Sequence, residues 1–314
     1  MRRKKKTPFI QILEFCAVYL AFQLSRAIPL WLAHRASWLL GGLVYYSLTR
    51  QRKVAVKNLR YVFGETKSEQ EIKTIARKSC NSLVGSWFET IRLISLLGRP
   101  EGKTAVLEAT EGLELLFQKA KELHVRSGGC IFVSPHLGNW EFFPYISACA
   151  GIPVVVVVRP LDNKYLEKWL YTRRQASGQI IISRANSMFF LQNALRRGKS
   201  IGMLPDQSTM KAISVDYLGR KATTTPIPAI LAVLYNRPIV VVACCRKSKD
   251  FRYEGFVSDP ILPQPEGSEK EEIFRLTEMM NREMRAIVER YPEQYLWMHD
   301  RWKRYRHKRE MLLK

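Results

Sequence analysis

Two residues of the chain, His136 and Glu141, have the types and the spacing needed to move a proton. They lie in SPHLGNWEFF, directly after the apolar run GCIFVS, where Pro135 and Gly138 predict a turn. On one continuous helix, side chains five positions apart point about 140° away from each other, so the pair can meet only if His136 lies in a loop and Glu141 in the first helical turn. Asn139 is suited to cap that helix, which would place Glu141 where a carboxylate is favoured.

Such a pair predicts general base catalysis. His136 would take a proton from an attacking hydroxyl, while Glu141 would hold the ring tautomer and stabilise the imidazolium. A carboxylate orients the histidine of serine proteases in the same way, but no serine nucleophile is needed here. The alternative is structural: His-x4-Glu also arises by chance, with a satisfied loop histidine and an ordinary acid at a helix start.

Arginines follow other apolar runs and are candidates for binding anionic groups. Arg159 ends PVVVVV, which puts it at the same sheet edge as His136 if the two strands are parallel, and it could hold phosphates of a lipid or a carrier. Arg173, Arg174 and Arg184 are weaker candidates for the same role. Each could instead be solvated surface charge.

Asp206 follows a further expected strand, in LPDQS. Its carboxylate could support the histidine or bind a substrate hydroxyl. It could also form only an Asx-type turn after Pro205. The residues around it leave these alternatives open.

Signatures of other enzyme classes are missing from the sequence. It has no G-x-S-x-G, H-E-x-x-H or G-x-G-x-x-G motif, and the segment 98–103 is one residue short of a phosphate loop. The six cysteines show no Cys-x-x-Cys spacing, which speaks against a zinc site or a disulfide framework. They are typical of core residues in a reducing compartment.

The elements that must position these residues alternate from residue 127 onward. Expected strands are GCIFVS, PVVVVV, QIIIS, SIGMLP and RPIVVVACC, with helical stretches between them and a closing helix near 268–290. Short β-branched runs between helices indicate an α/β fold, a mixed central sheet flanked by helices and buried on both faces. Upstream, Ser68 and Glu71 have the spacing of a capping box that starts a long amphipathic helix.

Positive charge is concentrated in three segments. The 314 residues carry a net charge of +23, and residues 2–6, 50–60 and 301–314 contribute +5, +5 and +6 of it. Such clusters suit a solvated face, a nucleic acid or an anionic membrane surface.

The apolar sequence beside the first two clusters favours a membrane. Residues 8–49 are strongly apolar with Trp and Tyr near their ends, although Glu14, Arg26, His34 and Arg35 interrupt them. A single span and an interfacial helical pair bent near Pro29 are both open, and we favour the pair. The expected organisation is a membrane-associating helical segment, 1–49, followed by a larger domain, 50–314.

The sequence resembles the late acyltransferases of bacterial lipid A biosynthesis, the lauroyl/myristoyl group of the glycerolipid acyltransferase superfamily. SPHLGNWEFF is similar to their His-x4-Asp/Glu motif. Further similar segments are VKNLRYVFGE (56–65), VVRPLDN (157–163), MLPDQS (203–208), VDYLGRKATT (215–224) and YLWMHDRWK (295–303). The resemblance covers about residues 8–305, with Asp300 standing where the last motif ordinarily carries a basic residue.

The resemblance implies transfer of a fatty acyl chain from a thioester, on acyl carrier protein or CoA, to a hydroxyl of a membrane-embedded lipid A precursor. It implies His136 as base and Glu141 as its partner, at the inner membrane with the active site facing the cytoplasm. A thioester needs no metal, cofactor or covalent enzyme intermediate, only an activated hydroxyl and oxyanion donors. We expect the backbone N–H groups of Gly138 and Asn139 to be those donors, and Asn139, Arg159, Arg173, Arg174 and Asp206 to contact substrate.

Two alternatives remain at this stage. One is an acyltransferase for another glycolipid, such as a phosphatidylinositol mannoside, because the sequence does not show the shape of the acceptor groove. The other is a basic lipid- or nucleic-acid-binding module without chemistry. A binding module has no reason to bring His136 and Glu141 together.

Overall fold

The computed structural model describes residues 6–97, 101–176, 178–183, 186–210, 212–247, 252–264 and 267–303. Their α-helices are α1 (Pro8–Ala27), α2 (Leu30–Ser47), α3 (Thr49–Phe63), α4 (Glu69–Leu97), α5 (Gly102–Glu108), α6 (Glu114–Ser127), α7 (Phe142–Cys149), α8 (Lys164–Ala176), α9 (Ser187–Arg196), α10 (Ile227–Tyr235) and α11 (Glu269–Arg290). The strands are β1 (Ile131–Val133), β2 (Val154–Val158), β3 (Ile180–Ser183), β4 (Ser200–Met203), β5 (Ile213–Tyr217), β6 (Arg220–Thr224), β7 (Ile239–Arg246) and β8 (Tyr253–Val257). A short 3-10 turn, η1 (Pro292–Gln294), follows α11.

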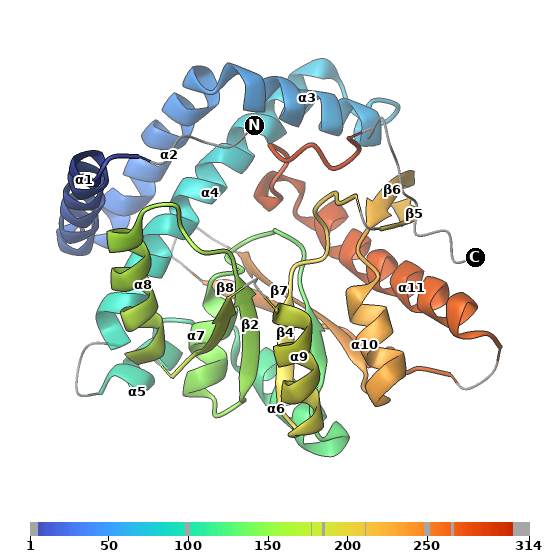
Figure 1. Cartoon of the computed structure of the whole chain (residues 1–314). Helices are drawn as coiled ribbons and strands as arrows, with labels where there is room; N and C mark the ends of the chain where they lie inside the picture. Colours follow the sequence, from blue (N-terminus) through green and yellow to red (C-terminus); the bar gives the residue numbers. More distant parts are fainter. Residues whose placement is uncertain are drawn as a thin grey trace.

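A six-stranded mixed sheet forms the centre of the molecule (Figure 1). Its order is β3-β2-β4-β1-β7-β8; the pairings from β3 to β7 are parallel and β8 joins antiparallel. The predicted α/β fold with a mixed central sheet flanked by helices is confirmed. Because β1, β2 and β4 run in the same direction, the loops that leave their carboxyl ends meet at one edge of the sheet.

Helices cover both faces of this sheet, as the near-continuous apolar strands require. Ile131 and Val133 of β1 belong to one core cluster, with side chains of α9, α10 and α11. Phe132, between them, belongs to a second cluster with side chains of α6 and α7. The alternation along a strand thus divides the core into two layers.

The long helix α4 begins as predicted. The Ser68 hydroxyl accepts a hydrogen bond from the Glu71 backbone N–H at 3.3 Å, and Glu71 Oε2 accepts from the Ser68 backbone N–H at 2.8 Å. These reciprocal bonds satisfy donors that a helix start leaves open. Figure 1 shows α4 running between the N-terminal helices and the sheet.

The N-terminal segment is a helical pair. α1 ends at Ala27 and α2 begins at Leu30, with Pro29 as its N-cap, so the predicted break near Pro29 is confirmed. α1 meets α8 through Phe22, whose ring lies 5.0 Å from that of Trp169. Most other large apolar side chains of the pair are exposed, including Leu39 at 76% and Leu43 at 61%.

Candidate active site

His136 lies in the loop after β1, and its partner is Asp206, in the loop after β4. The His136 Nδ1 atom is 2.5 Å from Asp206 Oδ1, and the His136 backbone N–H donates to Asp206 Oδ2 at 2.8 Å. Strands β1 and β4 are adjacent and parallel, which brings the two loops together. Asp206 is 1% exposed, so its carboxylate is held in one place beneath the ring.

These contacts fix the tautomer of the imidazole. A carboxylate only accepts, so Nδ1 carries the hydrogen, and Nε2 accepts from the Gln207 side-chain amide, 3.1 Å away. Burial alone would favour a neutral ring, but the charge of Asp206 and its hydrogen bond, with a smaller effect of Glu141, raise the pKa of His136. Burial opposes ionisation of Asp206 as well, yet the adjacent imidazole lowers the pKa of that carboxyl.

Glu141 lies near His136 without taking the position expected for it. Its Oε2 accepts from Arg174 Nη2 at 3.1 Å, and Asp206 occupies the Nδ1 side of the imidazole instead. The helix α7 begins only at Phe142, with Glu141 as its N-cap residue, so Asn139 is not the cap. Glu141 therefore acts on the ring by charge rather than by the predicted hydrogen bond.

The geometry does not support Gly138 and Asn139 as oxyanion donors. Their backbone N–H groups already donate to the carbonyls of Gln294, at 3.1 Å, and Cys244, at 3.0 Å. Gly138 has φ +62°, and a Cβ there would lie 1.9 Å from the Cys244 carbonyl oxygen. The turn is thus pressed against β7, and its glycine permits that close approach.

Asn139 has a structural position. Its side chain is 2% exposed and donates to Glu89 Oε2 of α4 at 2.8 Å. Glu89 also forms a buried ion pair with Arg246 of β7. A buried polar network therefore ties the loop of His136 to α4 and to the sheet, and Asn139 does not face the cavity.

The chain's C-terminal motif closes over the same loop. The Leu296 backbone N–H donates to the His136 carbonyl at 2.9 Å. Asn58 of α3 donates to the carbonyls of Trp297, at 3.0 Å, and His299, at 2.7 Å. The segment around Leu296 thus holds the histidine loop, and α3 holds that segment.

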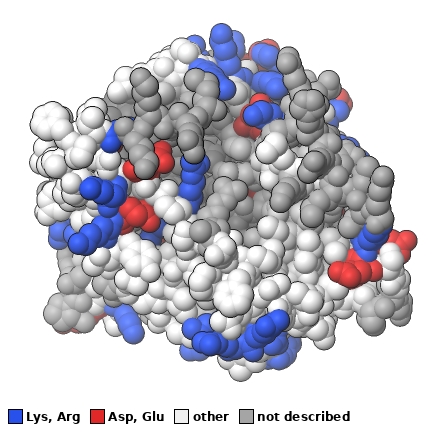
Figure 2. All heavy atoms as spheres, viewed as in Figure 1, with Lys and Arg blue, Asp and Glu red and all other residues white. Residues whose placement is uncertain are grey.

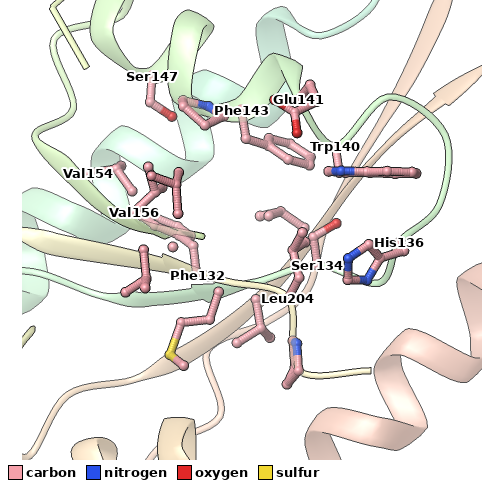
Figure 3. Close-up of a pocket in the computed structure, with 18 of the residues that line it drawn as sticks. Phe132, Ser134, His136, Trp140, Glu141, Phe143, Ser147, Val154, Val156 and Leu204 are labelled. Atoms are coloured by element: carbon pink, nitrogen blue, oxygen red, sulfur yellow. The ribbon is translucent and has the colours of Figure 1, made fainter. Parts of the chain in front are cut away.

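An open cavity of about 610 Å³ begins at His136 (Figure 3). His136 and Trp140 lie at one end, their rings 5.2 Å apart, and the lining continues past Phe143 and Val156 to Val154 and Ser147. The remaining lining is largely apolar and reaches α6 through Leu116, Phe117 and Ala120. Gly202 of β4 adds no side chain to the floor, where a Cβ would approach Val156 at 3.0 Å.

The structure places only some of the candidate arginines at the cavity. Arg159, at the end of β2, and Arg174, of α8, both line the cavity. Arg173 does not: its guanidinium lies 4.8 Å from the ring centre of Trp169 and 5.1 Å from that of Phe22, so it packs α1 against α8. Arg184 lies outside the described residues.

Gln207 is the site residue that the sequence interpretation missed. Its signal was its position directly after Asp206, at the tip of a strand adjacent to β1. The spacing of residues in the sequence does not predict the contact of Gln207 with His136 or the ion pair between Glu89 and Arg246. Among the described residues, no group of three His, Cys, Asp or Glu side chains could hold a metal ion.

Comparison with known proteins decides the family. Residues 2–304 match bacterial lipid A biosynthesis acyltransferases. The chain belongs to this family. It is 26% identical over 268 residues to the lipid A biosynthesis palmitoleoyltransferase of Escherichia coli K12, covering 84% of this chain and 82% of the relative.

Two further family members are similar over most of their length. The lipid A biosynthesis lauroyltransferase of E. coli K12 is 25% identical over 283 residues, covering 88% of this chain and 87% of the relative. The lipid A biosynthesis acyltransferase of Haemophilus influenzae is 23% identical over 297 residues, covering 92% and 84%. Because the relatives are named for different acyl chains, membership in the lipid A acyltransferase family establishes acyl transfer but not the lauroyl/myristoyl type.

Proposed function

We propose that this lipid A acyltransferase moves a fatty acyl chain from a thioester, on acyl carrier protein or CoA, to a hydroxyl of a lipid A precursor, with His136 as general base. The observation that carries the proposal is the His136–Asp206 pair at the mouth of an apolar cavity. Nδ1 is held by a buried carboxylate, which leaves Nε2 as the basic nitrogen on the cavity side. A non-catalytic module has no need of this arrangement.

The reaction balances with these groups alone. Nε2 takes the proton of the acceptor hydroxyl while the hydroxyl oxygen forms a bond to the thioester carbonyl carbon. The tetrahedral oxyanion then collapses, the carbon–sulfur bond breaks, and the imidazolium returns its proton to the leaving thiolate. The negative charges of Asp206 and Glu141 stabilise the imidazolium between the two steps.

Gln207 is the residue we assign to the oxyanion in place of Gly138 and Asn139. Its amide nitrogen lies 3.1 Å from Nε2, where the acceptor hydroxyl must bind. When the hydroxyl takes over that hydrogen bond, the amide is free to donate to the oxyanion that forms beside it. Arg159 and Arg174, which both line the cavity, are assigned to anionic groups of the substrates.

The cavity suits the acyl chain. Beyond the polar groups near His136, apolar side chains line it towards α6, and its volume falls in the range of small-ligand sites. The strongly basic chain, with a net charge of +23, would also attract an acidic carrier protein and make its association salt-sensitive.

We place the enzyme at the inner membrane, with residues 1–49 as the attaching segment. α1 is long and apolar enough to cross a membrane, and among the described helices it alone passes that test. We favour interfacial attachment, because Phe22 of α1 is 3% exposed and is used for packing on α8. The six free cysteines fit an active site on the reducing, cytoplasmic side.

The test is mass spectrometry of lipid A from cells lacking the gene and complemented with wild type or His136→Ala. We expect wild type to restore the mass of one acyl chain and His136→Ala to restore nothing, while still folding and fractionating with membranes. His124→Ala is the control, because His124, near the end of α6, bonds Ser200 at the start of β4 and does not line the cavity. Normal acylation by His136→Ala would refute the mechanism.

A further inference from the structure

A second pocket lies where the end of α2, α3 and the first turns of α4 meet. It has a volume of about 810 Å³ and shares no lining residue with the cavity at His136. Figure 2 shows Lys and Arg side chains at the top of the molecule, where Figure 1 places α3. The proposed acyl transfer at His136 does not use this pocket.

Five cationic side chains from α3 and α4 line the pocket: Arg52, Lys53, Arg60, Lys73 and Arg77. Arg60 is neutralised by Glu69, which accepts two hydrogen bonds from its guanidinium, at 2.6 and 2.8 Å. Within the described ranges, the other four form no ion pair with a carboxylate. The pocket therefore carries an excess of four positive charges and calls for an anionic ligand.

Aromatic rings hold two of these cations in place. The Arg52 guanidinium lies 5.6 Å from the ring centre of Tyr45, and that of Arg77 lies 5.9 Å from that of Trp38. Both rings belong to α2, so α2 fixes side chains of α3 and α4 at the pocket. Such positioning lowers the entropy lost when an anion binds.

An apolar ridge on α2 borders the pocket. Leu39, Leu43 and Tyr46 follow at helical intervals and are 76%, 61% and 60% exposed, and Tyr46 also lines the pocket. A cationic pocket beside an exposed apolar ridge matches the boundary of a bilayer, where headgroup phosphates lie next to acyl chains. An acidic protein would complement the charge but would leave the ridge uncovered.

We propose that this pocket binds the phosphate headgroup of an anionic phospholipid while the α2 ridge enters the bilayer beside it. The inference rests on the membrane attachment proposed above, and it identifies the pocket and the α2 ridge as the surface that meets the bilayer. The opposite side of α3 carries Asn58, which holds the segment that closes over the His136 loop. A headgroup bound at α3 would therefore set how the active-site cavity faces the membrane.

The test is flotation of the full-length protein with vesicles of neutral phosphatidylcholine, with and without phosphatidylglycerol. The pocket variant replaces Arg52, Lys53, Lys73 and Arg77 by Gln. The matched control replaces four exposed cations elsewhere by Gln, at Lys103, Lys121, Arg126 and Lys221, so that both variants lose the same net charge. Acyl transfer is measured in parallel in detergent micelles with acyl carrier protein as donor.

We expect the pocket variant to lose its preference for phosphatidylglycerol, with roughly a tenfold or larger fall in partitioning, and the control to lose much less. Transfer in micelles should stay near wild type for both variants. Equal losses of partitioning for the two variants would refute a headgroup site in this pocket and show that only the total charge of the protein matters. A raised KM for acyl carrier protein with unchanged flotation would also overturn it, in favour of a carrier-docking site. Transfer absent from wild type itself would instead refute the proposed function.

Discussion

Replacing Asp206 by Asn tests the assignment of the histidine's partner. The substitution keeps the size of the side chain but changes its hydrogen bonding. Asp206 accepts two hydrogen bonds, from the backbone N–H of His136 at 2.8 Å and from Nδ1 at 2.5 Å, whereas an amide has one oxygen. Either donor must then face the amide nitrogen.

Each orientation of the amide has a defined cost. If its oxygen stays on Nδ1, the backbone N–H is left unsatisfied and buried, which costs about 1–3 kcal/mol of stability. If its oxygen turns to the backbone, its nitrogen donates to Nδ1, the hydrogen moves to Nε2, and the base is lost. The loss of the equivalent carboxylate in serine proteases lowers kcat by about 10⁴-fold, or about 5.5 kcal/mol.

We therefore expect Asp206→Asn to lower kcat by roughly 10³- to 10⁴-fold with little change in KM. The assay is single-turnover transfer from acyl carrier protein in micelles, together with nitrogen NMR of the His136 tautomer. His124→Ala again controls for a histidine site outside the cavity. A kcat within tenfold of wild type, with the wild-type tautomer retained, would refute the role of Asp206.

Three further results follow from the same geometry. Because the negative charge of Glu141 contributes to raising the pKa of His136, and the base must be neutral, Glu141→Gln should move the acid limb of kcat/KM to lower pH; an unmoved limb would show that this charge does not reach the ring. Glu89→Gln leaves Arg246 buried without its partner charge and should cost about 3–5 kcal/mol in urea unfolding, and a cost below about 1 kcal/mol would contradict the pairing. Ala120→Leu narrows the inner end of the cavity and should shift donor preference in competition assays toward shorter chains, by about 1–3 kcal/mol per excluded methylene; an unchanged preference would show that the chain does not reach α6.

The elements of the fold were predictable because their signals are local. Apolar runs bounded by turn residues located β1, β2, β3, β4 and β7, and the Ser68–Glu71 spacing located the start of α4. Pro29 located the break between α1 and α2. The order of strands in the sheet was not predictable, because pairing between β1 and β4 is a contact between distant residues.

The partner of His136 could not be predicted for the same reason. Spacing in the sequence favoured Glu141, five residues away, whereas the bond to Nδ1 comes from Asp206, seventy residues away, through parallel pairing of their strands. The sequence around Asp206 left open whether it supports the histidine, binds a substrate hydroxyl or forms only an Asx-type turn. The N–H groups of Gly138 and Asn139 were expected to be free, but they donate to carbonyls of η1 and β7. These partners could not be predicted, because no local sequence pattern relates η1 or β7 to this turn.

The hydrogen bond from Leu296 to the His136 carbonyl has a consequence for biosynthesis. The histidine loop is completed only when the segment that contains Leu296 and Trp297 has been made and has docked against α3. Helices α1 and α2, by contrast, precede that segment in the chain and are synthesised earlier. On the attachment proposed above, a growing polypeptide would reach the bilayer before its histidine loop is complete, and termination shortly before Leu296 would leave that loop without this hydrogen bond.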